Sequence, residues 1–543
     1  MVAWAVPPLG LAYVAASIAE AGHDVTIVDG VGEDPARVTP VAEGHLLQRG
    51  LDVDEVAARV PAATDVIGVS CMFSQEWPYV RPVVQALRAR CPSAIIVGGG
   101  EHISALPEYV MQDSPIDHCI LGEGEDTIVD LLSALAGGRP ATDVPGLVTR
   151  RHGDFVRTPP RARLRNVDDI PLPLWDAFPI EKYIGLGMSF GVPRGRTIPM
   201  LATRGCPYQC TFCSSPDMWT TRWLARDPAK VLDEIRGYMA RYRVENIDFY
   251  DLTAIIKREW ILDFCHLIKA SGLRFTWQLP SGTRSEAIDA EVAAALYETG
   301  CRNIAYAPES GAPTELRRIK KKVKVPRMLD SMRAANRHGL RVKTNIVVGF
   351  PGQTMREVLQ TMWFLVRVAA LGGSDVAIHL YSPYPGAELY RQLRNEGRLP
   401  PPGDDYFRWL FNYLDLSTGE AMSFSEHLTN RQVAAARFFG TALFYLVSMT
   451  LRPWRLVALL YHLGVGRYET VLESGLAGFL TRRRERRNER RVERLSPSRV
   501  PAPLPDRAEK VAEDAQAGGR KREVARRMGV MGGARIERAT PGL

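Results

Sequence analysis

The 543-residue sequence lacks any run of 18 uncharged apolar residues, so we expect no transmembrane helix. Its first residues, MVAWAVPPLG, lack the basic start and long apolar run of a signal peptide, which predicts a cytoplasmic protein. Its eight cysteines are too scattered to suggest a disulfide framework in a cytosolic chain of this length. These absences argue against a secreted, disulfide-stabilised or membrane-embedded protein.

Excess positive charge is missing from most of the chain. Residues 481–543 hold 18 Lys and Arg against 9 Asp and Glu, whereas the net charge of the whole chain is +8. The preceding residues are therefore close to neutral, which argues against a nucleic-acid-binding core. Because the tail is also rich in Pro, Ala and Gly, with few large apolar residues, we expect it to be mostly disordered.

Residues 1–140 alternate between helix and strand patterns. Leu9–Ala21 reads as a helix, and the strand patterns are His23–Asp29, Asp65–Ser70 and Ala94–Val97. β-branched runs between helices indicate a parallel sheet covered on both faces, so this region predicts an α/β, doubly wound, Rossmann-like domain. The pattern lacks a first strand. The Pro- and Arg-rich residues 141–195 predict a linker with little regular structure.

Residues 196–400 repeat the alternation six times, which predicts a partial (β/α)6 TIM-like barrel with functional groups at the C-terminal ends of its strands. The expected strands are Thr197–Thr203, Asn246–Asp251, Arg274–Gln278, Asn303–Tyr306, Arg341–Val348 and Asp375–Tyr381, with helices such as Pro228–Tyr242 and Glu259–Ala270 between them. Residues 401–480 are expected to be helical, with a very apolar stretch from Arg437 to Tyr461 that Pro453 interrupts.

Three of the cysteines stand together at the end of the first barrel strand. Cys206, Cys210 and Cys213 lie in ATRGCPYQCTFCSSP, with the spacing Cys-x3-Cys-x2-Cys. Thiolates suit zinc or iron–sulfur clusters. Structural zinc normally takes four protein ligands, and the next cysteine is Cys265. Three thiolates on a [4Fe–4S] cluster leave one iron open, which favours a substrate-binding cluster; the alternative is zinc completed by a distant ligand.

This motif resembles the signature of the radical S-adenosylmethionine (SAM) superfamily, Cys-x3-Cys-x-aromatic-Cys, with Phe212 in the aromatic position. The resemblance implies that the open iron binds the amino and carboxylate groups of SAM. It also implies that electron transfer into SAM releases a 5′-deoxyadenosyl radical, which removes a hydrogen atom from an unactivated carbon. The cofactor then carries the difficult chemistry, and the barrel positions it.

The resemblance continues at the ends of later strands and implies further SAM contacts. Asp251 matches an acidic position after the second strand, although Leu252 departs from the common acidic pair. Glu309 and Ser310, in AYAPESG, match a Glu-Ser pair after the fourth strand; a solvated carboxylate is the alternative. Lys320 matches a lysine often found after that pair, or belongs to a solvated basic run.

Two glycine-containing turns complete the set. Gly349, Pro351 and Gly352 match the turn after the fifth strand, and Tyr384, Pro385 and Gly386 match the segment after the sixth. Glycines there would let the backbone approach SAM closely. SAM binding is therefore expected of Phe212, Asp251, Glu309, Ser310, Gly349, Pro351, Gly352 and Tyr384. Simple tight turns are the alternative for the glycines.

The N-terminal region resembles the cobalamin (B12)-binding domain that precedes one large class of radical SAM enzymes. The matching segments are PPLGLAYVAASIAEAGHDVTIVD, VGGGEHISALPE and LGEGEDTIVDLL. They imply cobalamin contacts at Pro8, Leu9, Gly10, Ser70, Gly98, Gly99, Gly100, Gly122, Glu123 and Gly124. The Asp-x-His-x-x-Gly motif is absent, so no lower histidine ligand is expected, and His102 is interpreted as a loop residue. The alternative is a degenerate domain that only packs on the barrel.

The stretch CTFCSSPDMWTTRWLARDPAKVLDEI resembles the anaerobic magnesium-protoporphyrin IX monomethyl ester cyclase group and the class B radical SAM methyltransferases. The resemblance implies C-methylation or oxidative cyclisation of a hydrophobic biosynthetic intermediate, with ferredoxin or flavodoxin as reductant. The rival hypothesis is a non-catalytic iron–sulfur or cobalamin sensor with a basic output tail.

Apolar helices beside arginines also predict peripheral membrane contact through residues 430–500; a helical cap on the barrel is the alternative.

Overall fold

The computed structural model describes residues 5–41, 46–284, 287–410 and 422–481, and nearly all of the predicted basic tail lies outside them. Both predicted α/β domains belong to one compact unit, Met1–Ala477.

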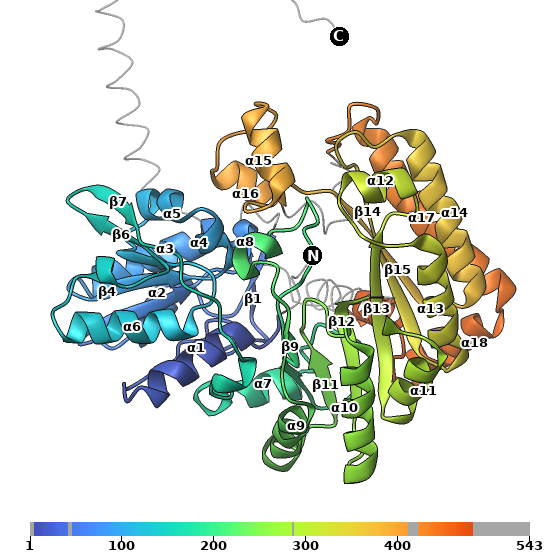
Figure 1. Cartoon of the computed structure of the whole chain (residues 1–543), viewed down its shortest axis with the longest axis horizontal. Coiled ribbons are helices and arrows are strands. Elements are labelled where there is room, and N and C mark those ends of the chain that lie inside the picture. Colours follow the sequence, from blue (N-terminus) through green and yellow to red (C-terminus); the bar gives the residue numbers. More distant parts are fainter. Residues whose placement is uncertain (1–4, 42–45, 285–286, 411–421, 482–543) are drawn as a thin grey trace, which may run out of the picture. The chain divides into compact units, whose positions relative to one another are not determined.

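A five-stranded sheet forms the centre of the N-terminal domain, drawn in blue and teal in Figure 1. Its strand order is β3-β4-β5-β6-β7. Its strands are β3 (Val66–Ser70), β4 (Ile95–Gly99), β5 (His118–Ile120), β6 (Leu147–Arg151) and β7 (Asp154–Arg157). The helices of this domain are α1 (Leu9–Glu20), α2 (Val53–Arg59), α3 (Trp77–Arg90), α4 (Glu101–Ala105), α5 (Pro107–Asp113) and α6 (Glu125–Ala136), with the short turn η2 (Ser74–Glu76). Strands β3, β4 and β5 are parallel.

Helices cover both faces of this sheet. Trp77 and Val84 of α3 pack with Ile96 in one apolar core, whereas Leu131 of α6 packs with Val97 in another. The predicted doubly wound α/β arrangement is confirmed for this region.

The predicted strand His23–Asp29 is wrong, because no described residue pairs with it in a ladder. In the flavodoxin-like order of such sheets, the second strand pairs only with the first, and no strand precedes it among the described residues. Side chains hold the segment instead, since buried Asp29 accepts a hydrogen bond from the Tyr183 hydroxyl at 2.9 Å. The chain continues into a separate hairpin, β1 (Val38–Val41) and β2 (Leu46–Arg49).

The segment predicted as a linker holds more regular structure than expected. Strands β6 and β7 add an antiparallel hairpin to the edge of the N-terminal sheet, beside β5. The turn η3 (Ala141–Asp143) precedes this hairpin, and η4 (Val167–Asp169), η5 (Trp175–Ala177) and α7 (Ile180–Gly185) follow it. The Pro and Arg content concealed the hairpin, whose strands are only 5 and 4 residues long.

The second domain is an open barrel of six parallel strands in the order β15-β14-β13-β12-β11-β8. Its strands are β8 (Thr197–Met200), β11 (Asn246–Phe249), β12 (Thr276–Thr283), β13 (Cys301–Glu309), β14 (Arg341–Val348) and β15 (Asp375–Leu380). Its helices are α9 (Pro228–Tyr242), α10 (Arg258–Ser271), α11 (Ala290–Glu298), α12 (Pro313–Arg318), α13 (Val325–Arg337) and α14 (Met355–Leu371). In the described part of the chain the edge strands β8 and β15 do not pair with one another, so the barrel is open and the predicted partial barrel is confirmed.

The segment just before β8 fills the end of the barrel where its strands begin. Gly191 and Val192, just before β8, donate backbone hydrogen bonds to Asp248 and Gln278, at 3.0 and 3.1 Å. A Cβ at Gly191 would lie only 2.2 Å from the Gln278 amide, so only glycine fits there. The opposite, C-terminal ends of the strands are where functional groups are expected.

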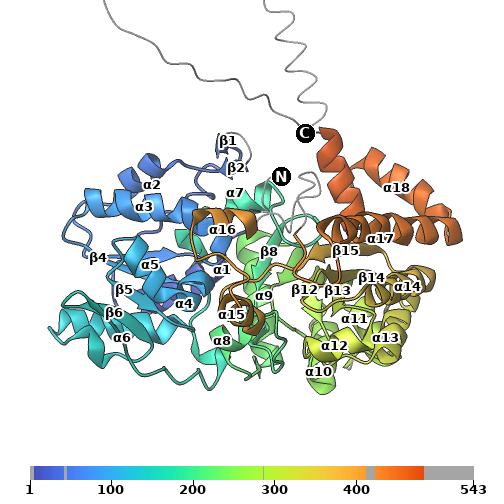
Figure 2. The same ribbon diagram turned by 90° about the horizontal axis from the view of Figure 1, so that it is seen from above.

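The described part of residues 401–480 is helical, as predicted, and the helical region begins earlier than expected, at α15 (Glu388–Asn395). It comprises α15, α16 (Asp404–Trp409), α17 (Asn430–Leu451) and α18 (Trp454–Val465), followed by an apolar helix, Val471–Thr481. Pro453 separates α17 from α18, as expected. By length and composition alone, α17 could cross a membrane, with a mean hydropathy of 1.4. However, Val433 and Phe444 of α17 are buried in the barrel core, and α17 and α14 lie side by side in Figures 1 and 2.

Candidate active site

The three clustered cysteines lie on a loop between β9 (Thr203–Arg204) and α8 (Ser215–Trp219). Backbone hydrogen bonds fix the loop, because the Thr211 N–H donates to Ile319 O at 3.1 Å and the Leu389 N–H donates to Thr211 O at 2.8 Å. Gly205 opens the loop with φ +88°, and a Cβ there would lie 2.3 Å from Arg222 O. The loop is therefore held by segments that follow the fourth and sixth barrel strands.

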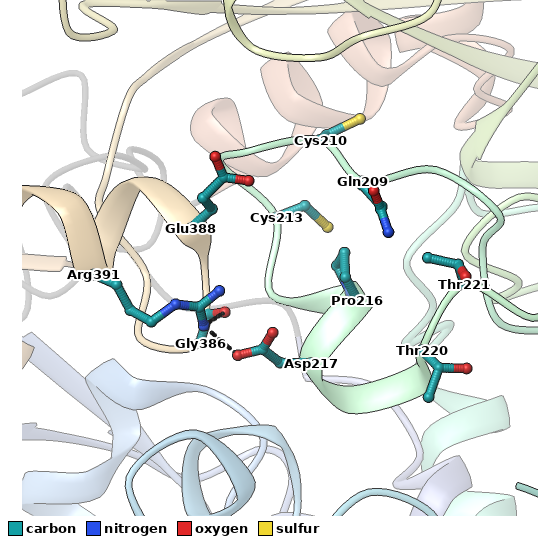
Figure 3. A pocket seen from close by; sticks show the side chains of 10 residues that line it. All are labelled: Gln209, Cys210, Cys213, Pro216, Asp217, Thr220, Thr221, Gly386, Glu388 and Arg391. Carbon is teal, nitrogen blue, oxygen red and sulfur yellow. Dashed lines mark hydrogen bonds and ion pairs between the residues drawn. The ribbon is translucent and has the colours of Figure 1, made fainter.

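The three thiols share this loop but do not converge on one point. In Figure 3 the sulfur atoms of Cys210 and Cys213 lie apart from one another. Among the described residues, no three His, Cys, Asp or Glu side chains are placed to hold a metal ion. The corners of a four-iron cube are separate iron atoms, so its thiolates need not meet at one point either.

Burial and nearby charges act on these thiols. Burial raises the pKa of Cys213 to about 12. Burial also raises the pKa of Cys210, against the opposing effect of the Lys321 ammonium. Iron binding must displace the protons of thiol ligands, and the Lys321 cation favours the thiolate form of Cys210. Cys206 is partly exposed.

An ion pair of low exposure stands beside the loop. Lys321 Nζ lies 2.9 Å from Glu309 Oε1, with side chains 12% and 10% exposed. Burial lowers the pKa of Lys321, but Glu309 and Cys210 outweigh it and raise the pKa overall. The Lys321 ammonium also lies 5.8 Å from the centre of the Phe212 ring. Glu309, a predicted SAM residue, thus lies close to the cysteine loop.

The backbone of Glu309 is strained, with φ at 66° in the left-handed region. Such a conformation costs about 1–3 kcal/mol in a residue other than glycine. It ends β13 and accompanies the pairing of the Glu309 carboxylate with Lys321. Strain of this kind is found mostly at functional sites.

The lysine that reaches the site is Lys321, one residue after the predicted Lys320. Lys320 instead pairs on the surface with Glu388, at 2.6 Å, with both side chains about half exposed. The basic run gave no means of choosing between adjacent lysines. Lys320 therefore fits the alternative interpretation, in which it belongs to a solvated basic run.

Asp251 and Ser310 are both buried and both have partners within the protein. Asp251 accepts hydrogen bonds from the Thr203 hydroxyl at 2.5 Å and from the Ala202 N–H at 3.2 Å. Burial raises the pKa of Asp251 to about 6. The Ser310 hydroxyl lies 3.1 Å from the Thr361 hydroxyl. Asp251 thus holds the strand that leads into the cysteine loop, and the predicted SAM contacts of both residues stay predictions.

The two glycine-containing turns lie at the ends of β14 and β15. Gly349 and Gly352 have φ values of 92° and 72°, and both bond within the protein: the Gly349 N–H donates to Gln353 Oε1 at 2.7 Å, and the Gly352 N–H donates to Glu426 at 2.8 Å. Pro351 lies between them. Tyr384 donates its hydroxyl hydrogen to Gln75 of the N-terminal domain at 2.7 Å. The segment after β15 therefore contacts both domains.

A cavity of about 420 Å³ opens beside the cysteines. Figure 3 shows its lining, which combines the cysteine loop with the segment after β15. Cys210 and Cys213 line it together with Gly386, Glu388 and Arg391. It is a polar recess at the C-terminal ends of the strands, where the barrel was expected to carry its functional groups.

Seven of the ten predicted cobalamin residues lie at the C-terminal ends of β3, β4 and β5 or shortly after them. Ser70 ends β3, Gly98 and Gly99 end β4, and Pro8, Leu9 and Gly10 form the start of α1. Gly100 has φ +107°, and a Cβ on it would lie 2.4 Å from Cys71 O, whereas a Cβ on Gly99 would meet nothing within 4 Å. These strand ends therefore include both a closed turn and an open space.

The third predicted loop is partly committed to contacts within the protein. Gly122 has φ +72°, and Gly124 precedes α6. Glu123 lies 3.0 Å from the Arg163 guanidinium, with both side chains 9% exposed. Sequence patterns gave no signal for this pairing, because Arg163 lies in the segment predicted to be an irregular linker.

His102 is a buried helical residue of α4 and not the loop residue expected. Its Nδ1 lies 2.9 Å from the Ser74 hydroxyl, and its ring packs against Trp77 and Phe407 at centroid distances of 5.4 and 5.1 Å. Burial lowers its pKa to about 3.

The residues fit the predicted cofactors. Three cysteines within eight residues supply soft thiolate ligands, which suit an iron–sulfur cluster that leaves one iron open. The open space at Gly99 suits a ligand that approaches the backbone closely.

No sequence pattern pointed to three residues near the cysteine loop, Lys321, Arg284 and Tyr208. The Arg284 guanidinium lies 3.7 Å from the centre of the Tyr208 ring, and Tyr208 is two residues after Cys206.

Comparison with known proteins gives two family matches. A model described as the radical SAM superfamily matches residues 200–365, and one described as the B12-binding domain matches residues 2–132.

Similar proteins also span both domains. The chain is 31% identical over 386 residues to the uncharacterized methyltransferase PH0819 of Pyrococcus horikoshii, covering 71% of this chain and 78% of that protein. It is 26% identical to the anaerobic magnesium-protoporphyrin IX monomethyl ester cyclase of Synechocystis sp., covering 66% of this chain and 67% of that protein. The fold is similar to that of the radical S-adenosylmethionine methyltransferase TsrM from Kitasatospora setae, with a TM-score of 0.57, 18% identity and 73% of both chains covered.

Proposed function

The chain belongs to the radical SAM superfamily, among the members that carry an N-terminal B12-binding domain, and we propose that it methylates a carbon atom of a hydrophobic biosynthetic intermediate. It is an enzyme that uses a [4Fe–4S] cluster, SAM and cobalamin to act on a small molecule, and it needs a reductant. The relatives are methyltransferases and cyclases, which does not support the alternative of a non-catalytic sensor.

One observation carries the proposal. Residues at the two ends of the cysteine loop contact the helix starts that follow the glycine loops of the N-terminal domain, since Arg204 bonds to Glu125 at 2.8 Å and Ser214 bonds to Glu101. When bound, the cluster supplies the electron that cleaves SAM, and cobalamin supplies the methyl group. Methyl transfer to a carbon activated in the barrel requires the two cofactor loops to face one another.

The residues act by holding and orienting. Cys206, Cys210 and Cys213 would ligate the cluster, while Glu309 and Lys321 would place opposite charges beside it for the polar groups of SAM. The predicted contacts of Phe212, Gly349, Pro351, Gly352 and Tyr384 with SAM remain part of the proposal. So do those of Pro8, Leu9, Gly10, Ser70, Gly98–Gly100 and Gly122–Gly124 with cobalamin.

The experiment is anaerobic incubation of the reconstituted enzyme with cell extract, dithionite and SAM carrying a deuterated methyl group. Methylation predicts a new product that contains the deuterated methyl group. A product that has lost hydrogen and carries no label would establish oxidative cyclisation and overturn the proposal. Replacing dithionite with pre-reduced ferredoxin or pre-reduced flavodoxin tests the expected reductant.

We also propose that the C-terminal helices touch an anionic membrane surface. Large apolar side chains on α17 and α18 are about two-thirds exposed, among them Phe438, Phe439, Trp454, Val457 and Leu460. Exposed Arg467 follows α18, and an arginine-rich stretch follows Thr481 in sequence. Apolar helices flanked by arginines suit the surface of an anionic bilayer.

Vesicle flotation tests the membrane proposal. Wild-type protein should float with vesicles containing phosphatidylglycerol, and Val457→Glu should reduce flotation without loss of thermal stability, because Val457 is 68% exposed. Val457→Ala is the matched control. Absence of flotation by the wild type, or self-association that depends on Val457, would contradict membrane docking.

A further inference from the structure

Two glutamates occupy corresponding positions in the N-terminal domain. Glu101 is the first residue of α4 and follows Gly98–Gly100 after β4. Glu125 is the first residue of α6 and follows Gly122–Gly124 after β5. Each carboxylate therefore starts a helix directly after one of the glycine loops proposed to bind cobalamin.

Glu125 reaches the beginning of the cysteine loop. Its Oε1 accepts a hydrogen bond from Arg204 Nη2 at 2.8 Å, and both side chains are about 5% exposed. Arg204 lies two residues before Cys206. Its guanidinium also lies 5.5 Å from the Tyr13 ring centre and 5.4 Å from that of Trp219, so apolar rings as well as charge fix its position.

Glu101 reaches the end of the same loop. Its carboxylate accepts a hydrogen bond from the hydroxyl of Ser214, the residue directly after Cys213. Burial raises the pKa of Glu101, and the Ser214 hydroxyl opposes that effect. The segment Cys206–Cys213 is thus held at both ends by carboxylates from the other domain.

We infer that Glu101 and Glu125 are positioning residues that couple cobalamin binding in the N-terminal domain to retention of the cluster in the barrel. The inference rests on the proposed function. A ligand that orders the glycine loops also fixes the two helix starts, and these fix the ends of the cysteine loop. Because coupling between two binding sites is reciprocal, the cluster must favour cobalamin binding by the same factor.

The test follows iron release from the anaerobically reconstituted enzyme to a chelator, with and without saturating hydroxocobalamin. In the wild type, cobalamin should slow the release about fivefold or more. In Glu101→Gln and Glu125→Gln, release should be faster, and the cobalamin effect should fall below about twofold. Glu125→Asp keeps the charge but has a shorter side chain. Its rate of iron release should lie between those of the wild type and Glu125→Gln.

The control is Glu108→Gln in α5, which breaks an exposed ion pair with Arg157 in the same domain. Variants that match Glu108→Gln, or a cobalamin effect that persists unchanged in the two glutamine variants, would overturn the inference and indicate simple shielding of the cluster. Failure of the wild type to bind a cluster or cobalamin would instead contradict the proposed function. Circular dichroism of each variant identifies any that does not fold.

Discussion

The two sets of strand ends in this molecule are built in opposite ways. At the barrel, the candidate site depends on side chains: three thiols, the Glu309–Lys321 pair, and Asp251 behind them. At the N-terminal sheet, it depends on missing side chains, as the open space at Gly99 shows. The barrel should therefore be sensitive to removal of functional groups, and the N-terminal sheet to addition of atoms.

The largest effect is expected at the cysteine loop. Cys210→Ser removes a soft thiolate ligand and should abolish both iron retention and the release of 5′-deoxyadenosine from SAM. The measurements are iron content after reconstitution and chromatography of the reaction. Cys91→Ser is the matched control, because its hydroxyl can still donate to Pro61 O as the thiol does. Full iron content in Cys210→Ser would remove that thiol from the proposed ligand set.

Lys321 and Lys320 allow a comparison between an ion pair of low exposure and an ion pair on the surface. Lys321→Met leaves Glu309 without its partner and should cost about 3 kcal/mol of stability in the cluster-free protein. Lys320→Met breaks an exposed pair and should cost less than about 1 kcal/mol. Urea unfolding compares them. Equal effects would show that Lys321 is no more important than its exposed neighbour.

Adding atoms tests the N-terminal sheet. A valine at Gly99 would enter open space, so Gly99→Val should leave the thermal unfolding temperature unchanged. It should weaken cobalamin binding about tenfold, which corresponds to about 1.4 kcal/mol. Absorbance titration with hydroxocobalamin measures the affinity. Gly68→Val, within the neighbouring strand β3 and also facing open space, is the control and should bind normally.

A further effect concerns pH. His102 has a folded pKa of about 3, against about 6.5 when unfolded, because burial disfavours its charged form. Below pH 6.5 the unfolded chain takes up a proton that the folded chain does not. The wild type should therefore lose about 1.4 kcal/mol per pH unit relative to His102→Gln. Thermal unfolding between pH 7 and 5 measures this, and parallel pH profiles for the two proteins would contradict it.

Sequence patterns predicted elements that are stabilised by their own local pattern. The six barrel strands and α9, which begins at Asp227-Pro228 and has the predicted bounds Pro228–Tyr242, needed no knowledge of distant partners. The pairing of strands was predicted less well. His23–Asp29 has the composition of a strand but pairs with no described strand, and the short β6–β7 hairpin joins the sheet only where β6 pairs with β5.

The same limit applies to the candidate site. The cysteine spacing is a local signal and located the loop directly. Lys321, and not Lys320, is the lysine whose side chain faces Glu309 at the end of β13. The spacing of residues in the sequence does not reveal the direction in which either side chain points. The contacts of Glu101 and Glu125 join segments about 80 to 110 residues apart, so they too became visible only in the folded chain.

Gly386 has a consequence for how the molecule tolerates change. A Cβ there would lie 3.2 Å from the Cβ of Ser214 and 3.3 Å from that of Ala105, and its φ of 89° also favours glycine. A single hydrogen atom thus sets the spacing between the last barrel strand, the cysteine loop and the other domain. Any larger group would act as a wedge, so a change made at the barrel would be transmitted to the N-terminal domain.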